Sequence, residues 1–158
     1  MKRRTAWIGV AAFAAAPPLL LRAQPTTAFV EVWKSPSCGC CKAWIAHLEA
    51  DGFRLESHDV GNNAIRARLK VPAKLGSCHT ALAGRYAIEG HVPAADVRRL
   101  LRDKPDAVGL AVPGMPLGSP GMDGPAYDNR QEPYDVLLVA HDGSTSVFNR
   151  YIPRKERT

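Results

Sequence analysis

The cysteines are the residues of this chain best suited to chemistry. Three of the four lie within four residues, at Cys38, Cys40 and Cys41, and the fourth is Cys78, which is followed directly by His79. Thiols packed this densely are hard to explain as core filling, and they indicate soft-metal binding, thiol–disulfide chemistry or both. A helix is expected to begin at this cluster, so its N-terminal amides and dipole would stabilise a thiolate at Cys38.

The spacing of the first three cysteines allows two kinds of chemistry. Cys38 and Cys41 are three residues apart, which suits a disulfide that opens and closes. Cys40 adds a thiol beside that pair, which would invite scrambling in a pure oxidoreductase but would let several thiolates bridge several metal ions. The cluster therefore predicts a metal site, with thiol–disulfide exchange as the alternative.

The other sulfur ligands favour copper over zinc. Thiolates suit both Cu(I) and zinc, whereas thioethers select Cu(I). Structural zinc usually takes two separated pairs of cysteines or their Cys/His equivalent, and this chain has only the adjacent Cys78 and His79 as a second half. Met115 and Met122 lie in Pro/Gly-rich turns, away from any periodic apolar face. Both are predicted copper ligands, and gap-filling in the core is the alternative.

Two of the five histidines are candidate imidazole ligands. His79 and His91 flank an expected strand, and His79 is the stronger candidate because it abuts Cys78. A lone histidine is more often an ordinary hydrogen-bonded residue, which is the alternative for both. The remaining three are predicted to be structural or solvated: His47, His58 and His141.

The elements that must position these residues alternate along the chain. Strands are expected over 29–33, 53–58 and 81–88, and helices over 42–50, 62–70 and 93–104. A Gly/Pro-rich stretch covers 109–133, and a hairpin around an Asp-Gly turn joins 134–140 to 145–151. This order predicts an α/β fold. A cysteine cluster that opens the first helix further predicts a thioredoxin-like three-layer fold with a C-terminal β-hairpin.

The N-terminal residues have the pattern of an export signal. Lys2, Arg3 and Arg4 precede an apolar run over 7–21, and Ala23 offers a small residue for cleavage. The expected division is a signal peptide over 1–23 and one metal-binding domain over 24–158. The Sec route is favoured, and the arginine pair makes the twin-arginine route the alternative. The apolar run is shorter than a membrane span and holds two prolines, so no stable membrane span is expected after cleavage.

The net charge argues against nucleic-acid binding. The chain has a formal charge of +6, with 21 basic and 15 acidic residues. The signal contributes four of the basic residues and no acid, which leaves 17 against 15, or +2. A nearly neutral domain lacks the basic surface that nucleic-acid partners require.

Several ordered motifs resemble one known family. They are residues 35–41, 77–80, 89–93 and 109–122, and together with their surroundings they make the chain similar to the CopG-type periplasmic copper-resistance proteins over about residues 29–150. The resemblance implies a thioredoxin-like fold and a periplasmic location. It also implies a cysteine-bridged, multinuclear copper cluster held by Cys38, Cys40, Cys41 and Cys78, with His and Met groups nearby.

The resemblance further implies a role in cycling copper between Cu(I) and Cu(II), as a copper oxidoreductase in copper resistance. Other copper-handling proteins of the envelope would then be the partners. Two alternatives stay open. One is a thiol–disulfide oxidoreductase that uses Cys38 and Cys41, and the other is a non-catalytic copper store or chaperone.

Overall fold

The computed structural model describes residues 28–153. The expected signal peptide over 1–23 lies outside these residues. Within 28–153, no helix has the length and apolar character needed to cross a bilayer.

A single mixed sheet of seven strands organises the described chain, in the order β2-β1-β3-β4-β5-β6-β7. The strands are β1 (Phe29–Lys34), β2 (Arg54–His58), β3 (His79–Ala83), β4 (Tyr86–Glu89), β5 (Gly109–Ala111), β6 (Tyr134–Val139) and β7 (Thr145–Tyr151). β1 runs parallel to β2, β4 runs parallel to β5, and the other neighbouring pairs are antiparallel. The predicted α/β class and the C-terminal hairpin of β6 and β7 are both confirmed.

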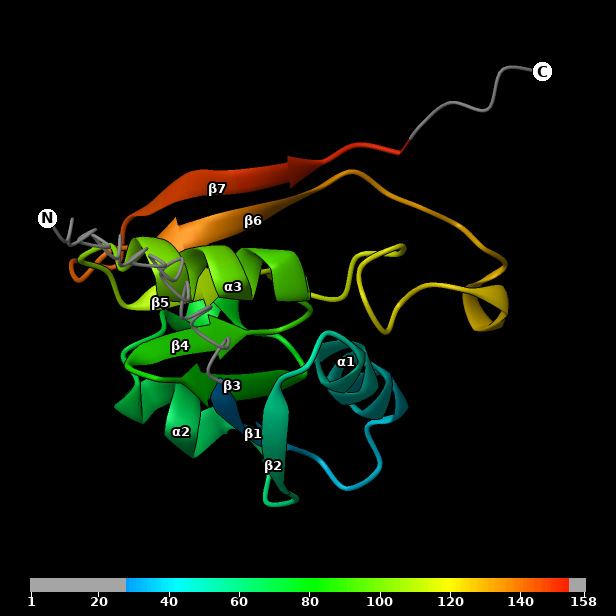
Figure 1. Cartoon of the computed structure of the whole chain (residues 1–158), viewed down its shortest axis with the longest axis horizontal. Coiled ribbons are helices and arrows are strands. Elements are labelled where there is room, and N and C mark those ends of the chain that lie inside the picture. The colour runs from blue at the N-terminus through cyan, green and yellow to red at the C-terminus, as the bar shows by residue number, and fades with distance from the viewer. Residues whose placement is uncertain (1–27, 154–158) are drawn as a thin grey trace, which may run out of the picture.

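Helices cover both faces of this sheet (Figure 1). They are α1 (Gly39–Ala50), α2 (Asn63–Arg68) and α3 (Ala94–Asp103), with short 3-10 turns at η1 (Ala73–Leu75) and η2 (Pro125–Tyr127). α1 and α3 pack on one face, where Trp44, Leu48, Val97 and Leu100 meet alternate side chains of β1, β3 and β4. The segment after α2 covers part of the other face. Alternation along the strands explains this division, because successive side chains point to opposite faces.

Two predicted elements differ from the structure. The single strand expected over 81–88 is two antiparallel strands, because Gly84 adopts a φ of +60° and turns the chain between β3 and β4. The first helix begins at Gly39 and not at residue 42, because the side chain of Cys38 caps it. Cys40 and Cys41 therefore lie in its first turn.

The Gly/Pro-rich stretch contains the short strand β5 and then a long irregular segment. Figure 1 shows this segment, in yellow and orange, leaving the sheet and returning as β6. It touches the first turn of α1: a Cβ on Gly121 would lie only 2.6 Å from the carbonyl oxygen of Cys40 and 2.8 Å from the amide nitrogen of Trp44. Only glycine permits this approach, and its φ of +86° makes the same demand. The loop is thereby held beside the cysteine cluster.

Candidate metal and redox site

The N-terminus of α1 presents three cysteines in different environments. Cys38 is the N-cap, and its sulfur accepts a hydrogen bond from the Cys41 amide at 3.3 Å. Cys38 and Cys41 form a disulfide with their Cα atoms 5.4 Å apart. Cys41 is fully buried, whereas Cys40 is half-buried and keeps a free thiol. The structure thus contains the disulfide that the Cys38-x-x-Cys41 spacing allows.

Cys78 reaches this cluster from the residue just before β3. Its sulfur lies 3.8 Å from the sulfur of Cys40, and Cys41 points its sulfur at the Cys78 carbonyl at 3.6 Å. The strand pairing accounts for the meeting, because β3 runs antiparallel to β1 and Lys34 faces His79 across the two strands. The start of β3 therefore lies beside the turn that leads from β1 into α1. Tertiary structure brings together residues that are 37 positions apart.

Both candidate histidines lie next to the Cys78 sulfur. The His91 Nε2 is 3.0 Å from it, and the His79 Nδ1 is 3.4 Å from it. The His79 and His91 rings meet edge to face with their centroids 5.1 Å apart. An adjacent Cys and His on a regular strand would point to opposite faces, but Cys78 lies outside the strand, so both side chains can face one site.

Hydrogen bonding prepares His91 for ligation. Its Nδ1 donates to the carbonyl of Pro120 at 2.8 Å, which leaves Nε2 with a free lone pair directed at Cys78. Burial lowers the pKa of His91, so the neutral ring is favoured. The Pro120 carbonyl belongs to the peptide bond that leads into Gly121. The close approach of Gly121 to α1 therefore also fixes the position of the carbonyl that orients His91.

His79 is fully buried against Trp44, with ring centroids 4.3 Å apart. Burial, and next the neighbouring His91, lower its pKa well below the usual value, so the ring is neutral at neutral pH. Its Nε2 is a buried polar atom without a hydrogen-bond partner among the described residues. Such atoms are rare in folded proteins, and a water molecule or an ion would satisfy this one.

The Cys78 thiol is poorly ionised in the metal-free protein. Burial and the nearby Cys40 raise its pKa to about 12. Metal binding displaces a thiol proton and so removes this cost.

The described residues contain two groups of donors that share one sulfur. Cys38, Cys40, Cys41 and Cys78 form a four-cysteine group, in which Cys38 and Cys41 are joined by the disulfide, and Cys78, His79 and His91 form a mixed group. Within each group all ligand atoms lie within 4.8 Å of one another. Each group has the donor types of a soft-metal site, and Cys78 belongs to both.

The two methionines occupy different positions. The Met115 sulfur lies 4.0 Å from the Cys40 sulfur, and its side chain is about half exposed at the edge of the site. Met122 is largely buried, and among residues 28–153 no hydrogen-bond-range contact of its sulfur with a cysteine is found. The structure thus places Met115, but not Met122, against the cysteines.

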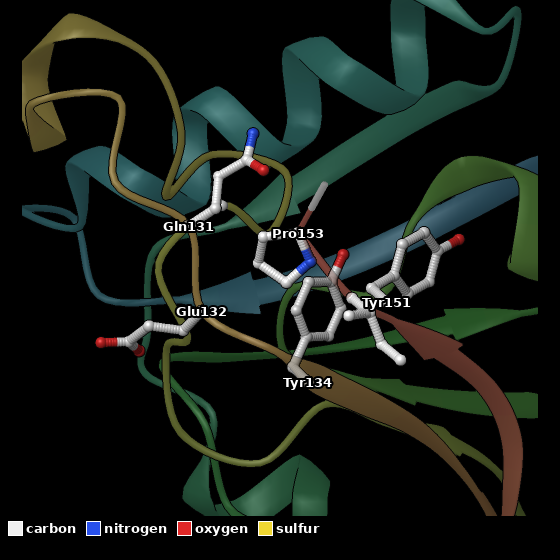
Figure 2. Close-up of a pocket in the computed structure, with 7 residues that line it drawn as sticks. Gln131, Glu132, Tyr134, Tyr151 and Pro153 are labelled. Carbon is white, nitrogen blue, oxygen red and sulfur yellow. The ribbon is translucent and has the colours of Figure 1, made fainter. Parts of the chain in front are cut away.

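The other histidines occupy structural positions. His47 accepts a hydrogen bond from the Ala94 amide at the start of α3, His58 stacks on Trp33, and His141 pairs with Asp106. A hollow beside the β6–β7 hairpin is separate from the site. Figure 2 shows that Gln131, Glu132, Tyr134, Tyr151 and Pro153 line it, and neither cysteine nor histidine is among its lining residues.

Sequence reasoning missed the residues that hold this site in place. They are Glu89, Arg66 and Asn62 around the Ser77 peptide, Gly121 against α1, and the Pro120 carbonyl at His91. Glu89 and Gly121 lie inside the family motifs over 89–93 and 109–122, and this was the signal in the sequence that could have indicated their role. A carbonyl acceptor leaves no mark on the sequence.

Comparisons with known proteins agree with this geometry. A family described as a protein of unknown function, DUF411, matches residues 75–122, which include Cys78, His79, His91 and both methionines. No curated protein matches the chain. One solved structure, "Copper resistance protein copG- Form 2", is 44% identical, with a TM-score of 0.73, over 79% of this chain and 98% of that one.

A second solved structure, "Copper resistance protein copG- Form 1", is 46% identical. It has a TM-score of 0.72 and covers 78% of this chain and 96% of that one. Identity at this level across nearly the whole of both solved chains shows common descent and not only a shared fold. The chain therefore belongs to the CopG-type copper-resistance protein family.

Proposed function

We propose that this protein binds copper as Cu(I) in the site formed by the four-cysteine group and the mixed group, which share Cys78. The observation that carries the proposal is the shared Cys78 sulfur, 3.8 Å from the sulfur of Cys40 and 3.0 Å from Nε2 of His91. A sulfur in that position can bridge two ions. The relatives of known structure carry the name copper resistance protein, which supports copper as the metal.

The donor set fits Cu(I). Thiolates and thioethers are soft ligands that select it, and neutral imidazoles suit it as well. The Nδ1 of His79, 3.4 Å from the Cys78 sulfur, would be the ring nitrogen offered to a bound ion. The proposed ligands are Cys38, Cys40, Cys41, Cys78, His79, His91, Met115 and Met122. Met115 supports the set through its contact with Cys40, and Met122 follows on the same loop.

We propose a thioredoxin-like fold as the frame for redox chemistry. Its support is the Cys-x-x-Cys pair at the start of the helix that follows β1, with β2 parallel and β3 antiparallel to β1. Opening the Cys38–Cys41 disulfide takes two electrons. Closing it from the two thiolates releases two electrons, which would reduce two Cu(II) ions to Cu(I), the state that thiolates favour.

A thiol–disulfide oxidoreductase is the second candidate, and the Cys38–Cys41 disulfide is the observation that favours it. Cys40 argues against it, because a free thiol 3.6 Å from the Cys38 sulfur would compete for the disulfide. A copper store or chaperone would use the same ligands without electron transfer.

The proposal includes export. Residues 1–23 would be removed as a Sec signal peptide, and residues 24–158 would act in the periplasm with other copper-handling proteins of the envelope. The pattern of Lys2, Arg3, Arg4 and the apolar run that follows supports this part.

Metal content and oxidation state test the proposal. Protein over 24–158, reduced and handled without air, is titrated with Cu(I) against a chromophoric chelator, and a zinc-loaded sample is titrated with Cu(I) in parallel. We expect more than one Cu(I) per chain and displacement of zinc by copper. One tightly held zinc ion that copper leaves in place would contradict the proposal.

A further inference from the structure

A buried ion pair holds the backbone next to the shared sulfur. Glu89, at the end of β4, is fully buried, and its Oε1 accepts hydrogen bonds from the Ser77 amide at 2.7 Å and from Arg66 Nε at 2.8 Å. Its Oε2 accepts from the Thr80 hydroxyl at 2.6 Å. Every acceptor on the carboxylate is thus directed at the segment that carries Cys78 or at the residue that supports it.

Arg66, on α2, and Asn62 hold the carbonyl of Ser77, whose amide Glu89 holds. The three side chains together are called the clamp of Ser77. The Nη2 of Arg66 donates a hydrogen bond to the Ser77 carbonyl at 2.6 Å, and the Nδ2 of Asn62 donates to the same carbonyl at 3.1 Å. Both backbone polar groups of Ser77 are therefore held by side chains. The carbonyl of Ser77 belongs to the peptide bond that leads into Cys78, so the clamp sets the direction in which the Cys78 side chain leaves the backbone.

The local packing leaves little freedom for another arrangement. A Cβ on Gly76 would lie 3.2 Å from the guanidinium carbon of Arg66, and a Cβ on Gly90 would lie 2.5 Å from the Ser77 hydroxyl oxygen. The Ser77 hydroxyl donates to the Gly114 carbonyl, next to Met115. Glu89 and His91 flank Gly90 in the sequence. Within residues 89–91, Glu89 therefore holds the Ser77 backbone and His91 faces the Cys78 sulfur.

A stabilising role alone does not explain this ion pair. Burying two charges costs several kcal/mol each, and replacing a buried pair with apolar side chains is often neutral or stabilising. Charge-assisted hydrogen bonds, however, fix geometry more tightly than neutral ones. Residues that orient metal ligands in this way can matter for affinity as much as tenfold or a hundredfold.

We propose that Glu89 and Arg66 are positioning residues, which act through the Ser77 peptide to hold the Cys78 sulfur between Cys40 and His91. This inference rests on the proposed function for its consequence in copper binding. The positioning itself is a property of the metal-free protein.

The first test therefore needs no metal. With the Cys38–Cys41 disulfide intact, Cys40 and Cys78 are the free thiols. Their alkylation rates by iodoacetamide are measured in the metal-free 24–158 protein by mass spectrometry of the two peptides. The ratio of the Cys78 rate to the Cys40 rate cancels any global loosening of the fold.

Glu89→Gln keeps the shape of the side chain but removes its charge and one acceptor. We expect the ratio to rise roughly fivefold, the factor that corresponds to weakening one charge-assisted hydrogen bond. Arg66→Gln should act in the same direction from the partly exposed side of the clamp, and it decides the question if Glu89→Gln does not fold. An unchanged ratio in a folded Glu89→Gln or Arg66→Gln protein would overturn the proposal.

Asp96→Asn is the matched control. Asp96 is also a buried carboxylate, with hydrogen bonds from Asn149 and Tyr151 of β7. The same carboxylate-to-amide change there should leave the ratio as in the wild type. An equal rise in Asp96→Asn would show that the ratio responds to the loss of any buried carboxylate, wherever it lies, and would also overturn the proposal.

The second arm measures Cu(I) affinity by chelator competition. We expect about a tenfold or larger loss in Glu89→Gln and none in Asp96→Asn. If the wild type binds no Cu(I), the proposed function fails, while the alkylation ratio still decides whether Glu89 and Arg66 position Cys78. If the wild type binds Cu(I) and Glu89→Gln binds it equally well, the positioning role is overturned.

Discussion

The two halves of the site are built in opposite ways. The thiol half, Cys38 to Cys41, is local: four consecutive residues at one helix terminus, partly exposed, with one sulfur used as a cap. The mixed half, Cys78, His79 and His91, comes from the residue before β3, the first residue of β3 and the segment after β4, with both histidines fully buried. In the thiol half, Cys38 and Cys40 are partly exposed, whereas Cys41 is fully buried. A buried half keeps its geometry because the core around it is packed.

Cys78 connects the halves, and removing it should have the largest effect. Binding to the native state alone stabilises by RT ln(1 + [L]/Kd), about 4 kcal/mol at a thousandfold excess over Kd. We expect Cys78→Ala to lose most of the Cu(I)-induced rise in melting temperature. Thermal unfolding of the 24–158 protein with and without Cu(I) measures this.

Two variants limited to one half sharpen the comparison. Cys40→Ser should lose only part of the rise in melting temperature, because Cys78, His79 and His91 remain. It should still form the Cys38–Cys41 disulfide, which does not use Cys40. His79→Ala should also lose only part, since Cys78 still anchors the metal. Equal copper-induced stabilisation in wild type and Cys78→Ala would show that the halves do not share a ligand.

The contact of the long loop with α1 should have the next largest effect. Gly121→Ala places a methyl group within 2.6 Å of the Cys40 carbonyl and imposes a positive φ on alanine. We expect a loss of about 2–4 kcal/mol in the free energy of unfolding, measured by urea denaturation, because strain of about 1–2 kcal/mol adds to displacement of the loop.

Gly114→Ala is the control for that change. Gly114 has a φ of +70°, similar to that of Gly121, but a Cβ there meets no heavy atom within 4 Å. It should show only the backbone strain, about 1–2 kcal/mol. Equal losses in the two variants would mean that the approach of Gly121 to α1 contributes nothing to the fold.

The smallest expected effect concerns the protonation of Cys78 in the metal-free protein. Burial raises its pKa to about 12 from an ordinary value of 9.0. Alkylation of Cys78 should therefore be slow at pH 8 and rise between pH 9 and 12, whereas urea-unfolded protein should show the ordinary midpoint near 9.0. Mass spectrometry of the Cys78 peptide across this pH range gives both curves.

The sign for stability follows from the same shift. The folded protein holds the Cys78 proton more tightly than the unfolded chain does, so this contribution to stability is complete below pH 9 and is lost as pH rises toward 12. A midpoint near 9.0 in the folded protein would contradict the burial of the Cys78 thiol.

The sequence alone determined the local half of the site and much of the fold. Periodicity predicted β1, β2, α3 and the C-terminal hairpin, and spacing allowed the Cys38–Cys41 disulfide, because these features depend on neighbours within a few residues. It did not predict the break at Gly84, since a glycine inside an apolar run is compatible with one strand or with two.

Tertiary structure decided the other half. The antiparallel pairing of β3 with β1 brings Cys78 to Cys40, and the approach of Gly121 to α1 gives His91 its Pro120 acceptor. The contact of the Met115 sulfur with the Cys40 sulfur also follows from the path of that loop. Contacts between distant segments depend on packing and strand pairing, and residue types and spacing along the chain do not encode them directly.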